Sequence, residues 1–235
     1  MKHIYFLIFV IFALMLGVQN LEAEELGSDL SLVGSYDSGS FNQVRGVTIS
    51  GNYAYVSNGF NGMGILNIEE PANPTLAGNY DTTYAHSVTI SGDYAYVADG
   101  GDGLTILNIE DPANPTFLKR FNAKDEVYEV AISGDYVYVV DGYYGLDVIS
   151  IEDPTNPTYV GNYNHSGNAR GITISGNYAY IAYGSSGLEI LSIEDPTNPT
   201  RVGNYSTDSY AYGVTISGNY AYVADGQNGL VILDI

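Results

Sequence analysis

The sequence predicts an all-β fold, a five-bladed β-propeller in which each blade is a four-stranded sheet. The first observation is a segment that occurs five times in close variants, beginning with Ile-Ser-Gly-Asn-Tyr-Ala-Tyr at residues 49–55. Its glycines recur at intervals of 41 and then 42 residues, at Gly51, Gly92, Gly134, Gly176 and Gly218. The second observation is four short runs rich in Val, Ile, Thr and Tyr in each repeat. Four strands in a repeat of about 40 residues are typical of a propeller blade, which buries its faces only against neighbouring blades.

The strands of the first repeat follow from its turn residues. Gly and Asn or Asp, and then Pro, interrupt runs of residues that favour strands. The expected strands are residues 45–50, 53–57, 64–68 and 75–80. No part of the chain after the first residues shows helical periodicity, so the fold contains no predicted helix.

The third observation is that the two ends of the chain complement each other. The last repeat stops at Ile235, which aligns with Ile68 at the end of a third strand. Residues 31–36 align with the fourth strand at 75–80. We therefore expect the N-terminal strand to complete the last blade and close the ring, which removes both exposed strand edges. A fragment of a larger propeller is the alternative.

The first residues predict export. Residues 1–23 have a short basic start, an uncharged apolar run and a polar stretch that ends at Ala23, which is the order of a secretory signal peptide. An uncleaved N-terminal anchor is the alternative. The expected organisation is a signal peptide at 1–23, a tail at 24–30 and the propeller at 31–235. We expect no membrane insertion after cleavage, and an extracellular, periplasmic or cell-surface location. The absence of cysteine excludes disulfides and a lipid-anchored cleavage site.

The charge narrows the classes of partner. A net charge of -20 argues against nucleic acid, because the phosphate backbone would repel the protein. Paired acids before the prolines, such as Glu110 and Asp111, suggest calcium at first sight, but their spacing matches no calcium loop and an acid before proline is ordinary turn chemistry. We expect no metal and no cofactor, and a monomer.

The repeated element Gly-Leu-x-Ile-Leu-x-Ile-x-Asp-Pro-x-Asn-Pro-Thr, clearest at residues 103–116 and 187–200, resembles the LVIVD-repeat family of bacterial and archaeal propellers. The resemblance extends over essentially all of residues 31–235. It implies an exported or cell-surface protein without an established enzymatic activity. It implies the architecture and little about the ligand.

Differences between the repeats separate structural residues from candidate binding residues. Fourteen tyrosines recur at fixed positions, and we interpret them as packing between blades. Other aromatic residues occur only in certain repeats, in the connections after second and fourth strands. In a propeller these connections share one face, called here the top face. The candidate binding residues of these connections are Phe60, Tyr84, Tyr143, Tyr144, Tyr183 and Tyr210. Solvated loop tyrosines without a ligand are the alternative.

A second set lies where each innermost strand begins, at the mouth of the expected central channel. Its members are Arg45, His86, Tyr128, Arg170 and Tyr212. Arginine at this place can hold a carboxylate or phosphate through forked hydrogen bonds. Alternatively, the arginines pair with acids such as Glu129 or Asp125, and His86 is a hydrogen-bonded loop histidine.

These patterns favour a non-catalytic binding or scaffold propeller that recognises a glycan or a protein segment at the cell envelope. The first alternative is a glycan-processing enzyme, which needs two facing carboxylates about 5–9.5 Å apart. The only plausibly placed acids, Asp125, Glu126 and Glu129, come from one connection, and no facing partner is evident. The second alternative is a structural or adhesion protein that works by self-association.

Overall fold

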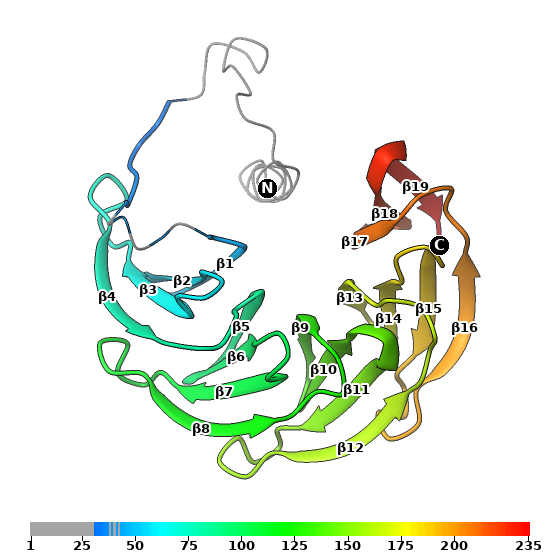
Figure 1. The fold of residues 1–235 in the computed structure, drawn as a ribbon, viewed down its shortest axis with the longest axis horizontal. Helices are drawn as coiled ribbons and strands as arrows, with labels where there is room; N and C mark the ends of the chain where they lie inside the picture. The colour runs from blue at the N-terminus through cyan, green and yellow to red at the C-terminus, as the bar shows by residue number, and fades with distance from the viewer. Residues whose placement is uncertain (1–30, 38, 40, 42) are drawn as a thin grey trace.

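The computed structural model describes residues 31–37, 39, 41 and 43–235, and it is an all-β protein. Its sheets follow one another along the chain and form an arc, with each sheet packed against the next (Figure 1). The predicted signal peptide and most of the predicted tail lie outside the described residues. In the described part, no helix has the length and apolar composition that a membrane crossing requires.

Five antiparallel sheets form the blades, and in each sheet the strands pair in chain order. The first blade consists of β1 (Gly46–Ser50), β2 (Tyr53–Ser57), β3 (Met63–Asn67) and β4 (Thr75–Tyr80). The second consists of β5 (Ser87–Ser91), β6 (Tyr94–Ala98), β7 (Leu104–Asn108) and β8 (Thr116–Phe121). The third consists of β9 (Val127–Ser133), β10 (Tyr136–Asp141), β11 (Gly145–Ser150) and β12 (Thr158–Tyr163). The fourth consists of β13 (Gly171–Ser175), β14 (Tyr178–Ala182), β15 (Leu188–Ser192) and β16 (Thr200–Tyr205). The fifth has β17 (Ala211–Ser217), β18 (Tyr220–Asp225) and β19 (Leu230–Asp234).

Local sequence explains these blades. Ser50 pairs with Tyr53 across a two-residue turn, and Gly51 adopts a φ of 56° there, which suits the tight hairpins of twisted sheets. The predicted strands of the first repeat are confirmed to within one residue. Two short 3-10 helices, η2 (Gly142–Tyr144) and η3 (Gly226–Asn228), stand in the connections after β10 and β18.

The core lies between blades, as the repeat predicts. Each pair of neighbouring blades shares one cluster of buried side chains. The second tyrosine of each Tyr-x-Tyr pair belongs to these clusters in the first four blades: Tyr55, Tyr96, Tyr138 and Tyr180. The prediction that these repeated tyrosines pack between blades is therefore confirmed for the buried members.

The innermost strands are joined by hydrogen bonds from side chains. Thr48 donates to the Val88 carbonyl over 2.6 Å, and Thr89 donates to the Val130 carbonyl over 3.0 Å. The third blade has Ala131 at this position in the repeat and no hydroxyl to donate. Glu129 provides the link instead, because its carboxylate accepts the Ile172 N–H of the next blade over 2.8 Å.

The ends of the arc differ from the predicted closed ring. β19 is the edge of a three-stranded sheet, and residues 31–37 contain no strand. Figure 1 shows β1 and β17 apart at the two ends of the arc. Residues 31–37 lie against the first blade instead, where Tyr36 and Phe41 pack on Ala54, Val56 and Leu66. Closure of the ring by the N-terminal strand stays a prediction.

Candidate functional site: a belt along the inner rim

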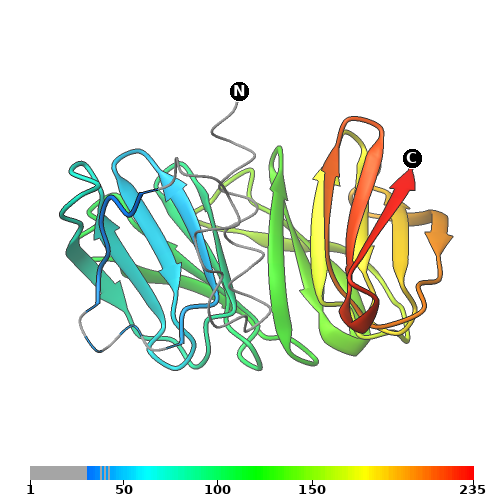
Figure 2. The ribbon, with the colours of Figure 1, turned by 90° about the horizontal axis from the view of Figure 1, so that it is seen from above.

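The two kinds of connection share one face, as predicted. The loop after each second strand lies beside the entry to the next blade, through the pairs Gly59–Ala85, Gly100–Val127 and Gly184–Ala211. Figure 2 shows the strands of the blades running between the two faces of the arc. The starts of the innermost strands therefore meet the loops after second strands on the top face.

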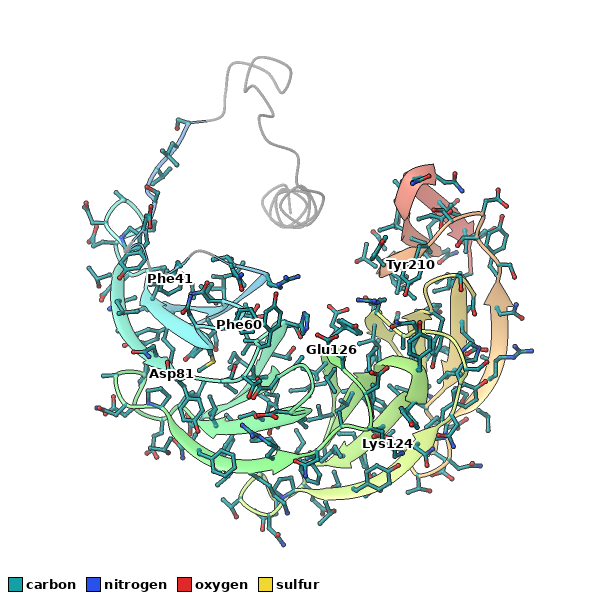
Figure 3. The ribbon with its side chains drawn as sticks, viewed as in Figure 1. Phe41, Phe60, Asp81, Lys124, Glu126 and Tyr210 are labelled. Atoms are coloured by element: carbon teal, nitrogen blue, oxygen red, sulfur yellow. The ribbon has the colours of Figure 1, made fainter. Side chains whose placement is uncertain are left out.

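An unbroken series of ring contacts follows the inner rim of this face. Phe60 meets Tyr84 with ring centroids 4.5 Å apart, Tyr84 meets His86 at 4.8 Å, and His86 meets Tyr128 at 5.0 Å. Arg170 then stacks on Tyr128, with its guanidinium carbon 3.9 Å from the ring centroid. Phe60, Glu126 and Tyr210 mark the course of this series in Figure 3.

The series continues to the last blade. The Nε of Arg170 donates to the Tyr210 hydroxyl over 3.3 Å, and Tyr210 meets Tyr212 at 4.9 Å. At the other end, Arg45 donates to the Tyr84 hydroxyl and lies over its ring at 5.0 Å. We call this set the rim belt: Arg45, Phe60, Tyr84, His86, Glu126, Tyr128, Arg170, Tyr210 and Tyr212. It contains all five predicted residues of the channel mouth.

The two arginines of the belt form no ion pair with a carboxylate in the part of the chain that the structure describes. Among the ion pairs of the described residues, none involves Arg45 or Arg170. The alternative that they pair with Glu129 or Asp125 is therefore wrong. Partial burial opposes the charge of Arg170, yet the Tyr210 hydroxyl, the neighbouring Tyr128 and the nearby charge of Glu126 raise its pKa. Stacking on an aromatic face orients a guanidinium while leaving its in-plane donors available, which suits recognition of an anionic or polar group.

Glu126 is the acid of the belt, and it is held from two sides. Its carboxylate lies 2.8 Å from the His86 Nε2 and accepts the Tyr128 hydroxyl over 2.9 Å. Partial burial opposes ionisation, but these two hydrogen bonds lower the pKa of Glu126. Burial lowers the pKa of His86, and this effect exceeds that of the Glu126 hydrogen bond. The alternative given for His86, a hydrogen-bonded histidine, is confirmed.

Glu129 lies beside the belt, on the innermost strand β9. It is partly buried, and desolvation raises the pKa of its carboxyl to about 7 in spite of the hydrogen bond from Ile172. The third acid of this connection, Asp125, accepts the Tyr143 N–H over 2.9 Å and so fixes the loop after β10. Each of the three acids named from the sequence therefore has a distinct structural partner.

The remaining predicted residues fall into two groups. Tyr143 and Tyr144 are 60% and 46% exposed, and they lie beside Lys124, whose ammonium is over the Tyr144 ring at 5.6 Å. They form an outer pair that the ring contacts of the belt do not reach. Tyr183 is fully buried against His165, with centroids 4.2 Å apart, so its prediction as a ligand contact is wrong. Its position in the repeat explains this, because the equivalent Asp99 and Asp141 are buried as well.

The sequence did not place Glu126 among the binding residues. The repeat holds a signal for it: Glu126 stands two residues before Tyr128, where other blades have Tyr84 and Tyr210. In the structure, the mouth residue of one blade contacts this second position of the next blade, as Arg45 does with Tyr84 and Arg170 with Tyr210. No group of metal-ligating side chains that could hold an ion occurs in the described part of the chain.

Comparison with protein families agrees with this architecture. A model described as "LVIVD repeat" matches five times, at residues 43–82, 83–123, 126–165, 166–207 and 208–235. The chain belongs to the LVIVD repeat family. The five matches correspond to the five blades, which confirms the resemblance seen in the sequence. No curated protein sequence matches the chain.

Solved structures share the fold of this LVIVD-repeat chain at low sequence identity. The computationally designed Ika8 protein is 9% identical, with a TM-score of 0.67 over 82% of this chain. A functionally unknown protein from Desulfotomaculum acetoxidans is 16% identical, with a TM-score of 0.66 over 82% of this chain and 68% of its own. The designed Ika4 protein gives 10% identity and a TM-score of 0.54 over 64% of this chain and 91% of its own. This chain spans 58% of the length of Ika8.

Proposed function

We propose that this LVIVD-repeat protein is a non-catalytic binding propeller, exported to the cell surface or beyond, which recognises a glycan or a protein segment along its rim belt. The observation that carries the proposal is the continuity of the belt, from Phe60 in the first blade to Tyr212 in the last. Exposed aromatic faces contribute much of the energy in recognition of other molecules, and arginine adds directed hydrogen bonds.

The charge of the chain strengthens the case for a role of the two belt arginines. Only seven Lys and Arg occur beside 27 Asp and Glu, yet neither arginine of the belt forms an ion pair with a carboxylate of the described residues. An arginine that only stabilises an acidic protein is expected to contact one of its many acids. Arginines stacked on tyrosines are instead arranged to meet a polar or anionic group of a ligand.

The test is binding of the purified chain from residue 24 onward to a glycan array and to peptides from the cell envelope. The double variant Arg170→Ala/Tyr128→Ala should lose capture of any hit by about tenfold or more. The matched control is Tyr143→Ala/Tyr144→Ala, which removes two exposed tyrosines outside the belt and should retain capture. Loss in the control and retention in the belt variant would place the site on the outer pair and overturn the proposal.

A glycan-processing enzyme is the second candidate, and Glu129 is the observation that favours it. A carboxyl with a pKa of about 7 is suited to proton transfer at neutral pH. Hydrolysis of a polysaccharide panel that disappears in Glu129→Gln would establish this function. Binding without turnover, unchanged in Glu129→Gln, would favour the binding propeller.

We also infer that residues 31–36 supply the fourth strand of the last blade. A Cβ at Gly34 would collide with the Pro71 carbonyl, as one at Gly78 would with the Pro112 carbonyl of the next blade. Residues 31–36 thus already lie beside the first blade as β4 lies beside the second. Closure then requires β19 to approach this segment.

A cysteine pair tests this closure, because the chain has no cysteine of its own. The pairing of Gly64 with Asn79 in the first blade corresponds to Val231 with Ser35 in a closed ring. Oxidised Ser35→Cys/Val231→Cys should give a cross-linked monomer, whereas Ser31→Cys/Val231→Cys, about 13 Å out of register, should not. A cross-linked dimer would indicate self-association instead, and no cross-link would indicate an open arc.

A further inference from the structure

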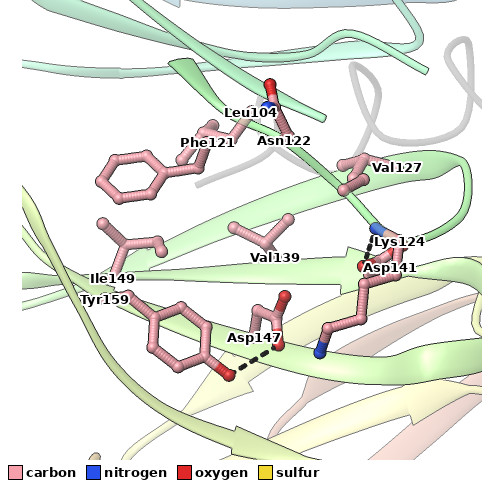
Figure 4. Close-up of a pocket in the computed structure, with 11 residues that line it drawn as sticks. Leu104, Phe121, Asn122, Lys124, Val127, Val139, Asp141, Asp147, Ile149 and Tyr159 are labelled. Atoms are coloured by element: carbon pink, nitrogen blue, oxygen red, sulfur yellow. Dashed lines mark hydrogen bonds between the residues drawn. The ribbon is translucent and has the colours of Figure 1, made fainter. Parts of the chain in front are cut away.

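A cavity opens between the second and third blades, away from the rim belt. It has a volume of about 340 Å³, and the residues around it come from both blades. Leu104, Phe121 and Ile149 provide apolar walls, while Asp147, Lys124 and Tyr159 stand at the other end (Figure 4). This size lies within the range of small-ligand sites, and apolar walls with a few polar groups are typical of them.

The equivalent space between the third and fourth blades is filled by the protein itself. There, His165 and Tyr183 stack at 4.2 Å, and Tyr183 is fully buried. The residues 42 positions earlier in the repeat are Ala123 and Asp141, which line the cavity. Asp141 is occupied with the chain itself, because it accepts the N–H groups of Lys124 and Asp125. The cavity thus has two small residues where the next interface has two ring-bearing ones.

The two neighbouring interfaces each contain an arginine where this cavity has none, although Lys124 stands at the polar end of the cavity. Between the first and second blades, Arg120 donates to Thr105 over 3.1 Å and pairs with Asp102 at 2.7 Å. Between the third and fourth blades, Arg201 pairs with Glu189 at 3.2 Å. Each cation thus serves a polar residue at one position of the third strand, where the third blade has Asp147.

Within the described residues, the carboxylate of Asp147 has no arginine partner, unlike the polar residues at the equivalent positions of the second and fourth blades. Its strand partner is Asn162 where the second blade has Arg120, and Tyr159 stands where the fourth blade has Arg201. The Tyr159 hydroxyl donates to its carboxylate over 3.1 Å. Burial raises the pKa of Asp147, although Lys124 opposes this. No ion pair of Asp147 occurs in the described residues, and the exposed Lys124 lies over Tyr144.

We propose that this cavity binds a cationic group on an apolar stem, with the ammonium or guanidinium at Asp147 and the stem against Phe121, Leu104 and Ile149. The ligand would supply from outside what Arg120 and Arg201 supply within the neighbouring spaces. Two sources carry this chemistry, a free organic amine and the basic side chain of a peptide. The site is separate from the rim belt, so it does not depend on the proposed function.

The probe for the free amine is 2-phenylethylamine, titrated by calorimetry into the full chain beside its neutral analogue 2-phenylethanol and the acid 3-phenylpropionate. The amine should bind at least about tenfold more tightly than the alcohol, and the acid should not bind. N-acetylarginine amide tests the peptide source in the same way. Tighter binding of the amine indicates a small-molecule site, and tighter binding of the arginine derivative indicates a peptide site.

Three variants connect the binding to this cavity. Asp147→Asn should weaken the amine about tenfold or more, because it removes the charge and retains the shape. Asn162→Arg, which copies Arg120, should block the amine by placing a cation at Asp147. Asn204→Arg makes the same change one blade later and is the matched control, so it should leave binding unchanged.

Lys124→Met is expected to bind the amine more tightly. Such a gain cannot result from a loss of fold, which could weaken binding in the other variants. Removing this competing ammonium should strengthen binding of the amine. The proposal is overturned if alcohol and amine bind equally, if neither cationic probe binds, or if Lys124→Met weakens the amine.

Discussion

The packing between blades and the rim belt follow opposite rules in the same repeat. The residues between blades are nearly constant along the chain, as in the buried series Tyr55, Tyr96, Tyr138 and Tyr180. The belt changes from blade to blade, with Arg45, His86, Tyr128, Arg170 and Tyr212 at one position. A position that has the same residue type in every blade is constrained by the packing of blade on blade. A position whose residue type differs between blades is free of that constraint. The difference indicates that stability resides between the blades and recognition along the rim.

The largest expected effect is in the core. Tyr138 is 2% exposed and packs between the third and fourth blades. Tyr138→Ala should lower the free energy of unfolding by roughly 3–5 kcal/mol, because it leaves a cavity that the sheets cannot close. Urea denaturation measures this loss. Tyr178→Ala, at a tyrosine that is 44% exposed, is the control and should lose much less. Equal losses of unfolding free energy in the two variants would mean that the buried tyrosines do not stabilise the fold more than the exposed ones.

Glu129 combines the two roles compared above. Its residue type differs from that of the other blades, yet the hydrogen bond that it accepts from Ile172 links two blades. Its pKa is raised to about 7 from an ordinary value near 4.5, so protonation favours the folded state. The stability that this proton provides is fully present below pH 4.5 and is lost as the pH rises to about 7. Wild type should therefore lose on the order of 1–3 kcal/mol more than Glu129→Gln across this range. Denaturation at pH 4.5 and pH 8 checks it, and parallel pH profiles would contradict it.

Arg170 should have a smaller effect on folding than on binding. Its stacking on Tyr128 contributes about 1 kcal/mol, so Arg170→Ala should lower the free energy of unfolding by about that amount. The more exposed Arg45 should contribute less in the same denaturation experiment. A loss above about 3 kcal/mol for Arg170→Ala would make it a structural residue and not a binding residue.

The smallest effect is expected at the outer pair. Tyr143→Ala and Tyr144→Ala should each change the free energy of unfolding by less than about 0.5 kcal/mol, because both side chains are largely exposed. Thermal unfolding of the two single variants is sufficient to see this. A clear destabilisation at Tyr144 would mean that its contact with Lys124 supports the loop.

Much of the fold could be predicted because the repeat carries both strand limits and strand order. The repeat predicts the second strand at 53–57, and β2 has these bounds. The prediction for Tyr183 is wrong: the sequence indicates an exposed aromatic residue in a loop, but the structure buries it at the repeat position of the buried Asp99 and Asp141. Residue type could not show this, because an aspartate at the equivalent positions does not indicate burial.

The cavity beside Asp147 could not be predicted in this way. It arises because Ala123 and Asp141 are small in one blade interface while Asn162 replaces an arginine. These residues come from different strands of two blades, and the repeat pattern does not show how much space their side chains leave between the blades.

The sequence alone determined five antiparallel sheets in chain order, the family, and the rim position of the varied residues, because a regular repeat fixes the register of every blade. The tertiary structure decided which side chains meet across blades: Arg170 with Tyr128, His86 with Glu126, and the open space at Asp147. It also placed residues 31–37 against the first blade. Such contacts join residues about 40 positions apart, and the packing of one sheet on the next sets their distance, which residue spacing does not encode.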